Sequence, residues 1–486
     1  MASTSGTLEI HDTRTDKNYT IQVTDNVILG ADLAEITACT DGVAEKPNKQ
    51  DRLRIFDPGY VNTAVIESDV TYCGDDEDGN PANLEFRGHS FDYLRKTHDF
   101  EDVTYLMIWG KLPSIFERNW LRRELAQACM DVPDSVINVI QSFPKETPYY
   151  PMLLGGLSAF LGANKDSIPA MSARNLYHDN IKALDRGCIQ TLAAYYMVLC
   201  AVYCHRNNRP FIRDVSLDRP MLDNLFLMMG LIEDTTSTRS RAMLHAINQV
   251  WISGVDHEMN NSNSALLHAA STLADPVSCF MSALASSYGI LHFGAVESVY
   301  TMLQRIGKPE NVTIAIAAAK ATRQRIMGVG HRVYKSRDPR IEPLKGLLHV
   351  LAAEGMKDPL LDVAYEMERQ IHQDKHFVDR KLCVNVDLYW PLSYTAMGIQ
   401  QDAMLPIFLC SRIVGMMTHW RESMLKPIKL WRPLIVFNGV RAPKDEEQQE
   451  MAPVPVAEAR KLSWPDQIAI SLLNLPGVPR LLTAVA

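Results

Sequence analysis

The chain has 486 residues, 47% of them hydrophobic, so it is long enough for one large core or two to three domains and too apolar to be disordered. Its formal net charge of −8 argues against a nucleic-acid-binding protein. Cations that meet an anionic ligand must therefore cluster locally, in a cleft.

The two ends of the chain carry no targeting pattern. Residues 1–17 contain Glu9, Asp12 and Asp16 and no apolar core, which excludes a secretory signal and disfavours a mitochondrial presequence. The last three residues, Ala-Val-Ala, are not a peroxisomal signal. We expect a cytoplasmic protein.

The first part of the chain is predicted to form short strands. Residues 7–10 and 19–23 alternate between apolar and polar side chains around a charged turn. Residues 55–60, 69–72 and 84–88 predict further strands in a small hairpin region. We therefore expect an amino-terminal β-rich region over residues 1–89.

From Ser90 onward the pattern is mainly helical, because apolar residues recur at intervals of three and four. Two predicted helices, 152–163 and 189–204, are apolar nearly all round, which suits a bundle interior or a subunit interface. The run at 189–204 is shorter than the roughly 20 residues that span a bilayer. It predicts a buried helix and no membrane span.

The nine cysteines lie at scattered spacings without a CxxC pair or a zinc signature, so no metal site and no disulfide framework is expected. Cys200 and Cys204, four apart in the apolar run, are interpreted as small core residues. A reducing compartment fits this usage.

The character of the chain changes after residue 440. Residues 444–450 are a charge run, Pro453 and Pro455 follow, and an apolar segment at 468–473 predicts a terminal helix. Residues 441–486 are predicted to be a tail without chemistry.

A basic, glycine-punctuated loop follows the predicted helices. From Gly330 to Arg340 it reads Gly-His-Arg-Val-Tyr-Lys-Ser-Arg-Asp-Pro-Arg, with His331 among four cations. Gly328 and Gly330 allow the backbone to approach a ligand closely enough for its amides to make contact, and the Asp-Pro turn fixes where Arg340 points. The loop predicts an anion-binding site; a solvated surface loop is the alternative.

Two other histidines stand in unusual settings. His257 begins a polar run, 256–264, that directly follows an apolar helix. His292 lies between two glycines just before a helical pattern that starts near Ala295. An imidazole at a helix amino terminus stays neutral and can donate a hydrogen bond to a carbonyl that becomes an enolate. A satisfied buried histidine is the competing interpretation.

One aspartate and two arginines complete the set of candidates. Asp387 follows an apolar approach and adjoins two aromatics, a setting that raises its pKa and suits a general base, although helix capping is an alternative role. Arg412 interrupts an apolar helix and Arg432 stands between Trp431 and Pro433. Each is either a structural ion pair or a carboxylate clamp.

Together these motifs resemble the citrate synthase family, especially its bacterial-type branch. The resemblance rests on residues 256–260, the glycine-flanked His292, residues 330–340, residues 385–389 and the helix around Arg412, and it extends over about 7–440. It implies a mainly α fold with a large helical domain (90–294 and 411–440) and a small closing domain (295–410). It also implies a homodimer.

The resemblance implies a role for each candidate. Asp387 would deprotonate an acyl-CoA, His292 would stabilise its enol form, and His331 would polarise the ketone of oxaloacetate. The carboxylates of oxaloacetate would be held by His257, Arg340, Arg412 and Arg432. CoA would contact Lys335, Arg332, Gly328 and Gly330. No cofactor is implied, because carboxylate and imidazoles supply acid and base.

The sequence departs from the family around the reacting acyl group. Phe293 follows His292 where a glycine is usual, Val296 stands where a polar residue is common, and Trp390-Pro391 follows the 385–389 motif. This apolar acyl pocket favours a longer acyl donor, as in fungal alkylcitrate synthases or 2-methylcitrate synthases. An acetyl-CoA enzyme with a repacked backbone is an alternative, and a non-catalytic acyl-CoA or dicarboxylate-binding regulator is another.

Overall fold

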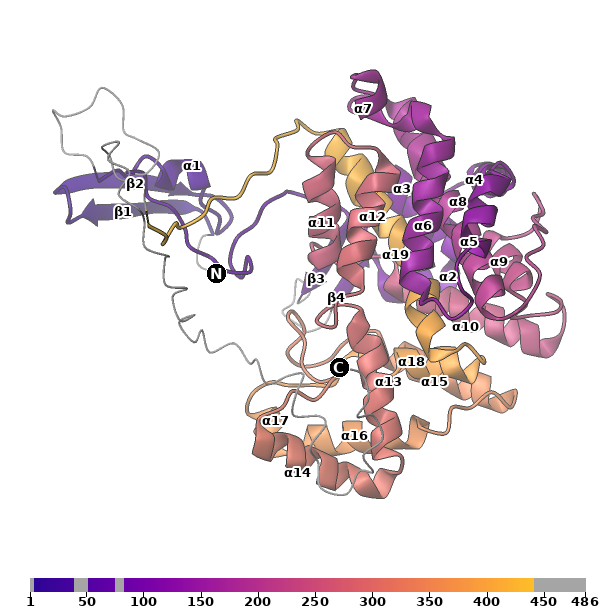
Figure 1. Cartoon of the computed structure of the whole chain (residues 1–486). Coiled ribbons are helices and arrows are strands. Elements are labelled where there is room, and N and C mark those ends of the chain that lie inside the picture. The colour runs from indigo at the N-terminus through magenta and orange to yellow at the C-terminus, as the bar shows by residue number, and fades with distance from the viewer. Residues whose placement is uncertain (1–3, 39–50, 75–82, 441–486) are drawn as a thin grey trace, which may run out of the picture. The chain divides into compact units, whose positions relative to one another are not determined.

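The computed structural model describes residues 4–38, 51–74 and 83–440 (Figure 1). Within these residues the chain divides into two compact units, one of residues 4–67 with 433–440 and one of residues 68–432. All the predicted site residues belong to the second unit. The predicted tail, 441–486, and its terminal helix lie outside the described residues.

The first unit contains an antiparallel hairpin. Strand β1 (Gly6–Asp12) pairs with β2 (Lys17–Val23), from Gly6 opposite Val23 to Asp12 opposite Lys17. The Asp12 carboxylate fixes the turn by accepting hydrogen bonds from the Arg14 backbone N (3.0 Å) and Nε (2.9 Å). A short helix, α1 (Gly30–Leu33), follows. The strands predicted at 7–10 and 19–23 are confirmed.

The strand predicted at 55–60 is wrong. The Asp57 carboxylate accepts hydrogen bonds from the backbone N of Val61 and of Asn62, both at 3.0 Å. This side-chain-to-backbone bonding, together with Pro58, which has no N–H, turns the chain where the sequence pattern suggested an extended segment.

The second unit begins with a small antiparallel sheet in the order β3-β4-β5. Its strands are β3 (Thr71–Gly74), β4 (Asn83–Phe86) and β5 (His89–Ser90). Arg87 and Gly88 join β4 to β5 with φ of 50° and 77°, the pair of positive values that a tight hairpin turn requires. The strands predicted at 69–72 and 84–88 are confirmed within one or two residues.

The remainder of the second unit is helical, which confirms the predicted mainly α class. Its longer helices are α2 (Phe91–Thr97), α3 (Phe100–Trp109), α4 (Ile115–Met130), α5 (Asp134–Gln141), α6 (Tyr149–Ala163), α8 (Ile181–Arg206), α9 (Met221–Met229), α10 (Thr238–Gly254), α11 (Asn261–Ala270), α12 (Pro276–Ser287), α13 (Gly294–Ile306), α14 (Val312–Thr322), α15 (Ile341–Ala353), α16 (Leu361–Gln373), α18 (Trp390–Ala396) and α19 (Gln401–Met424). Shorter pieces are α7 (Pro169–Ser172), α17 (Lys375–Val378) and the 3₁₀ turns η1 (Lys165–Ser167), η2 (Pro309–Asn311) and η3 (Val386–Leu388).

Helices α8 and α19 form the centre of this unit. Helix α8 packs against α19, α4 and α6, and its Tyr195 and Tyr196 hydroxyls donate to the carbonyls of Pro406 (2.7 Å) and Cys410 (3.1 Å) on α19. By length and composition α8 could cross a membrane, but 94% of its most apolar window is buried inside the protein. The prediction of a buried helix at 189–204, with core positions for Cys200 and Cys204, is confirmed.

Helices α13, α14, α16 and α17 lie together at one end of this unit, below the bundle of α6, α8, α11 and α12, and α15 packs against α10 and α18 (Figure 1). Helix α19 is continuous from Gln401 to Met424, so it runs through the domain boundary expected between residues 410 and 411. Helices α13 and α18 both pack against it. The domain limits remain predictions; what the fold establishes is that α19 connects both groups of helices.

Candidate active site

Hydrogen bonds join two loops, the one that carries His331 and the one that carries Asp387. The Gly330 N donates to the Cys383 carbonyl (2.7 Å), the Asn385 N donates to the Gly328 carbonyl (2.9 Å), and the Asn385 side chain donates to the Gly330 carbonyl (2.8 Å). Gly328 and Gly330 have φ of 78° and 86°, and a Cβ at either would press on Leu388 or Leu382.

The glycines therefore serve the junction between these loops. The Gly330 amide is bonded to the Cys383 carbonyl in this structure, and the contact of Gly328 and Gly330 with CoA stays a prediction. Backbone bonding of this kind holds the two loops in register, and with them the imidazole and carboxylate that each loop carries.

The protonation state of His331 follows from its hydrogen bonds. Its Nδ1 accepts from the backbone N of Val333 (3.1 Å) and of Tyr334 (3.0 Å), so in the neutral ring Nε2 carries the hydrogen. Burial, and then the Arg340 charge, lower the pKa of His331 to about 4. At neutral pH the ring therefore presents an uncharged Nε2–H donor.

His257 lies beside this ring. The ring centroids of His257 and His331 are 5.2 Å apart, and the Tyr334 ring stacks on His331 at 4.7 Å. Burial and Arg340 hold the pKa of His257 well below its usual range. Its Nε2 is buried and has no hydrogen-bond partner among the described residues. A buried ring nitrogen left unbonded by the protein suits a polar ligand.

His292 is also held in one neutral form, by a neighbouring helix. Its Nε2 lies 3.4 Å from the Ser262 backbone N and 3.0 Å from the Ser262 hydroxyl, at the amino terminus of α11. Because the amide can only donate, Nε2 is an acceptor and Nδ1 carries the hydrogen. Burial, and then Arg412, lower the pKa of His292 to about 4.

The predicted helix start near Ala295 is confirmed, since α13 begins at Gly294. The contact that fixes the His292 ring nevertheless comes from α11, through a backbone N–H in its first turn that has no partner within the helix. Sequence reasoning identified the kind of interaction but assigned it to the wrong helix.

Asp387 is positioned in the short turn η3. The residue that caps this turn is Asn385, whose side chain accepts a hydrogen bond from the Asp387 N (3.0 Å). The capping role considered for Asp387 therefore belongs to its neighbour. Burial raises the pKa of Asp387 to about 6 against the opposing effect of Arg340. A carboxylate with this pKa is ionised at neutral pH and basic enough to accept a proton.

Arg412 is a predicted clamp whose guanidinium has buried nitrogens that no described residue hydrogen-bonds. The side chain is 1% exposed, and its Nε and Nη1 have no hydrogen-bond partner among the described residues. The guanidinium lies 5.2 Å from the Phe293 ring centroid and 5.5 Å from that of Phe408. Burial lowers its pKa to about 10. This arrangement fits a carboxylate ligand.

The other two arginines differ from this pattern. Arg340 is buried and bonded to Asp338 through Nε (2.9 Å) and Nη2 (2.8 Å), so a structural ion pair takes part of its fork. Arg432 is exposed and follows Trp431, whose N donates to the Ser271 hydroxyl (3.1 Å). The role of Arg432 as an oxaloacetate contact stays a prediction.

Comparison with known proteins agrees with this geometry. Residues 59–434 match the family model for the citrate synthase C-terminal domain. The chain belongs to the citrate synthase family. A citrate synthase-like protein of Aspergillus oryzae, oryE, is 37% identical over 433 residues, which cover 89% of this chain and 95% of that protein. The alkylcitrate synthase phiJ of a fungal species is 35% identical over 94% of this chain and 98% of its own length.

The fold of this citrate synthase family member is also that of solved family structures. Citrate synthase from Thermotoga maritima aligns with a TM-score of 0.67 and 26% identity, over 82% of this chain and 98% of that structure. Citrate synthase from Pyrobaculum aerophilum aligns with a TM-score of 0.71 at 24% identity, over 81% and 93%. The predicted citrate synthase fold is confirmed.

The predicted acyl pocket is an aromatic cluster. Phe293 stacks on His292 with centroids 4.1 Å apart and packs against Phe408 at 5.1 Å, while Trp390 lies 4.6 Å from Phe408. Val296 is buried in the first turns of α13. Phe408 completes the cluster, and sequence reasoning missed it because its helix is apolar on every side.

The two predicted CoA contacts with charged side chains lie at the surface. Lys335 and Arg332 are both exposed, and the Lys335 ammonium donates to the His331 carbonyl (2.9 Å). This bond holds the Lys335 side chain beside the His331 backbone. Their role in binding CoA remains a prediction.

A buried anion, Asp256, lies next to the candidate residue His257 in the chain. Asp256 accepts hydrogen bonds from the Thr71 hydroxyl (2.6 Å), the Asn263 side chain (3.0 Å) and His419 Nε2 (3.1 Å). Burial by itself raises the pKa of Asp256, but His419 and Arg412 hold it below its usual range. Sequence reasoning noticed this residue only as part of a polar run.

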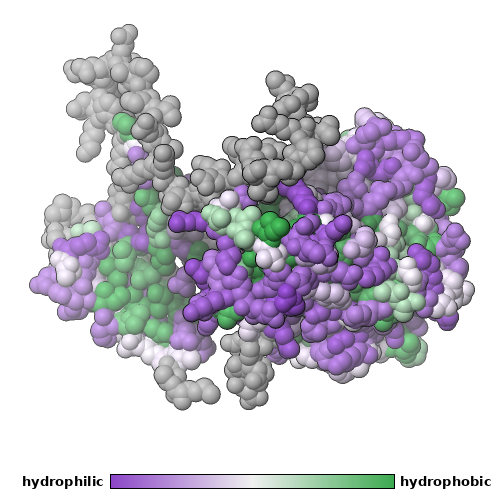
Figure 2. Space-filling model, turned by 90° about the horizontal axis from the view of Figure 1, so that it is seen from below, coloured by the Kyte–Doolittle hydropathy of each residue, from purple (hydrophilic) through white to green (hydrophobic). Residues whose placement is uncertain are grey.

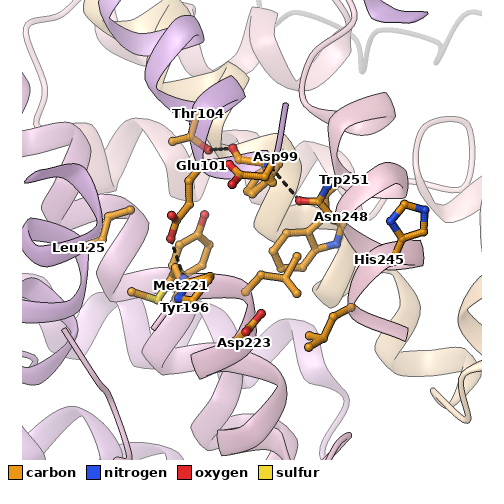
Figure 3. Close-up of a pocket in the computed structure, with 14 residues that line it drawn as sticks. Asp99, Glu101, Thr104, Leu125, Tyr196, Met221, Asp223, His245, Asn248 and Trp251 are labelled. Atoms are coloured by element: carbon orange, nitrogen blue, oxygen red, sulfur yellow. Dashed lines mark hydrogen bonds between the residues drawn. The ribbon is translucent and has the colours of Figure 1, made fainter. Parts of the chain in front are cut away.

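A separate cavity of about 240 Å³ lies away from these residues, among α3, α4, α9 and α10 (Figure 3). Two of its acidic side chains are already bonded within the protein: Glu101 to Arg122 (2.7 Å) and to the Met221 N (2.8 Å), and Asp99 to Arg118 (2.7 Å). The cavity shares no residue with the predicted site. In the described part of the chain, no group of His, Cys, Asp and Glu is arranged to hold a metal ion.

Proposed function

We propose that this protein condenses an acyl-CoA longer than acetyl-CoA with oxaloacetate and hydrolyses the resulting thioester, releasing a 2-alkylcitrate and CoA. The observation that carries the proposal is the pair of neutral histidines, His292 and His331, held in opposite tautomers, together with the raised-pKa carboxylate Asp387 on a loop that is hydrogen-bonded to the His331 loop. A protein that only binds acyl-CoA has no need of a tuned base.

In the proposed first step Asp387 takes the proton from the α-carbon of the acyl-CoA. His292 donates a hydrogen bond from Nδ1 to the thioester oxygen, which stabilises the enol form. Since the pKa of His292 is about 4, the ring stays neutral and acts as a hydrogen-bond donor rather than a cation.

In the proposed second step the α-carbon bonds to the ketone carbon of oxaloacetate. His331 donates from Nε2 to the ketone oxygen and supplies its proton to the alkoxide that forms. Water then cleaves the thioester carbon–sulfur bond, giving a carboxylate and the CoA thiol. The carboxylates of oxaloacetate would be held by Arg412, the remaining nitrogen of Arg340, and His257, with Arg432 as a further predicted contact.

Two features support an acyl group larger than acetyl. Relatives of this chain are named alkylcitrate synthases, phiJ among them and tstJ of Talaromyces stipitatus at 34% identity. Ile290 and Leu291 directly precede His292 and are 62% and 67% exposed, beside the Phe293 aromatic cluster. Together they offer apolar surface at the point where an alkyl chain would leave the reacting carbon.

The acyl donor can be identified by steady-state assays with oxaloacetate and acetyl-, propionyl-, hexanoyl- and decanoyl-CoA, following the released CoA thiol. We expect kcat/KM to rise with chain length, by up to about tenfold for each pair of added methylenes that is buried, before it levels off. A maximum at acetyl-CoA would identify an ordinary citrate synthase, and a maximum at propionyl-CoA a 2-methylcitrate synthase. Absence of CoA release with every donor would leave only the binding role.

We also propose that the protein is a homodimer. The all-round apolar helix α8 is accounted for inside one chain, so it does not support this. The support comes from the first unit, where two segments expose large apolar side chains. The Arg54 guanidinium joins these segments by donating to the Ile435 carbonyl (3.3 Å). The exposed side chains include Ile55, Phe56, Val61, Leu434, Ile435 and Phe437.

Hydrophobic areas also interrupt an otherwise largely hydrophilic face of the molecule (Figure 2). Monomeric proteins rarely leave a contiguous apolar surface of this kind uncovered. Sedimentation velocity should give twice the 54.6 kDa chain mass. The double substitution Phe56→Ser and Ile435→Ser should shift the species toward the chain mass, whereas the same species in both proteins would refute this surface as the interface.

A further inference from the structure

Asp338 is buried at 0% exposure in the basic loop, and both of its oxygens are fully used. Oδ1 accepts hydrogen bonds from the Arg340 N (3.1 Å) and Nε (2.9 Å). Oδ2 accepts from the Arg340 Nη2 (2.8 Å) and from the Val386 N (3.0 Å). One carboxylate thus holds both a predicted oxaloacetate ligand and the backbone next to the predicted base.

The bond to Val386 connects two distant segments of the chain. Val386 and Asp387 stand in the turn η3, and the Asn385 side chain also attaches this segment to the loop, through the Gly330 carbonyl at 2.8 Å, in addition to the backbone bonds between the two loops. The two side-chain ties differ in kind: that of Asn385 is neutral, and that of Asp338 carries a charge. Because they join the same two segments, they allow the effect of charge to be separated from that of loop position.

The charge of Asp338 acts on the same groups. Arg340, Arg325 and Arg412 are the cations that lower the pKa of Asp387, and Asp338 is the anion that raises it. By pairing with Arg340 in the fork geometry, Asp338 offsets the strongest of these cations. Arg340 meanwhile keeps one nitrogen, Nη1, outside the pair.

We propose that Asp338 is a positioning residue of the condensation: it ties the Asp387 turn to the histidine loop and takes one edge of the Arg340 guanidinium, so that only Nη1 of Arg340 faces the substrate. The inference rests on the proposed function. A consequence is that Asp387 remains a stronger base than three neighbouring arginines would otherwise allow.

Three variants test this, each assayed over pH 4.5–9 for kcat and kcat/KM of the best acyl-CoA at saturating oxaloacetate, and then for the KM of oxaloacetate at saturating acyl-CoA. Asp338→Asn removes the charge in nearly the same shape. Asp338→Glu keeps the charge and changes the geometry. Asn385→Ala removes the neutral tie between the same loops. Thermal unfolding of each variant shows whether it is folded.

We expect all three variants to lower kcat, because each disturbs the position of Asp387. Only Asp338→Asn should move the acid limb of the pH profile, to lower pH by about one unit, since only it removes an anion next to the base. It should also raise the KM for oxaloacetate at least tenfold, as Arg340 is freed to adopt other orientations.

A purely structural role predicts a different outcome, in which activity falls with thermal stability and the acid limb stays in place in every variant. That result, or an equal shift in Asp338→Glu, would overturn the inference. If Asp338→Asn does not fold, the KM for oxaloacetate decides: Asp338→Glu should raise it because the fork to Arg340 no longer matches, and Asn385→Ala, which leaves that fork intact, should not. Equal KM values in the two variants would overturn the inference. Absence of any turnover in the wild-type protein would instead overturn the proposed function.

Discussion

Replacing Asp387 by asparagine is expected to lower kcat by about a thousandfold, since general base catalysis by a positioned side chain contributes roughly 10² to 10⁴. Asparagine has nearly the same shape and can occupy the η3 turn, but it cannot accept the α-proton. Release of CoA from the best acyl-CoA and oxaloacetate measures the loss. Asp379→Asn, at an exposed aspartate after α17, is the matched control and should keep wild-type activity.

The pH dependence gives a second readout of the same residue. Because the pKa of Asp387 is raised to about 6, kcat/KM should fall tenfold per unit below pH 6 and level off above it. His292 and His331, with pKa values of about 4, are neutral throughout this range and cannot produce that limb. An unchanged limb near pH 6 in the residual activity of Asp387→Asn would contradict the assignment.

The same shift has a consequence for stability. A carboxyl whose folded-state pKa lies above its unfolded value binds protons more tightly when folded, so stability falls as pH rises from about 4 to about 6 and stays lower above that. Asp387→Asn removes this term. Its free energy of unfolding at pH 7.5 should therefore exceed that of the wild type, by roughly 1 to 3 kcal/mol.

Sequence reasoning reached the parts of this protein that are encoded locally. The β1–β2 alternation, the helical periodicity after Ser90 and the helix start near Ala295 all depend on neighbours in the chain, and the structure reproduces them. The segment at 55–60 failed because the Asp57 carboxylate competes for backbone amides, which apolar periodicity does not register.

The partners of the candidate site could not be predicted in the same way, because they are distant in sequence. Ser262 lies 30 residues from His292, and Asp338 lies 48 residues from Val386. The sequence signal for Asp338 was its place before a proline and two residues from Arg340, and it was interpreted only as a turn. Phe408 gave no signal at all within an apolar helix.

Arg412→Met is expected to separate binding from stability. The Arg412 cation is buried at 1% exposure between two phenyl rings, and its Nε and Nη1 are without partners among the described residues. Asp256 offsets only part of the desolvation of this charge, because no described residue hydrogen-bonds its Nε or Nη1. Methionine fills similar space without charge, so we expect the free energy of unfolding to be unchanged or to rise by about 1 to 4 kcal/mol.

The Arg412→Met variant should also lose affinity for oxaloacetate. Two charge-assisted hydrogen bonds are worth roughly 3 to 6 kcal/mol together, which corresponds to a loss of affinity of at least a hundredfold by isothermal titration calorimetry. Arg421→Met is the control on the same helix, because Arg421 is paired with Asp185 at 2.9 Å. It should keep oxaloacetate affinity and gain no stability, since it breaks an existing pair.

The stability of Arg412→Met depends on whether Arg412 stabilises the buried charge of Asp256 in the ligand-free protein. Asp256 already accepts hydrogen bonds from Thr71, Asn263 and His419, so its carboxylate stays hydrogen-bonded when Arg412 is replaced. A loss of 3 to 5 kcal/mol in Arg412→Met, the size seen when one member of a buried pair is removed, would show instead that the two charges form a structural pair. Retained stability with lost binding would mean that the arginine is kept at this position for the substrate.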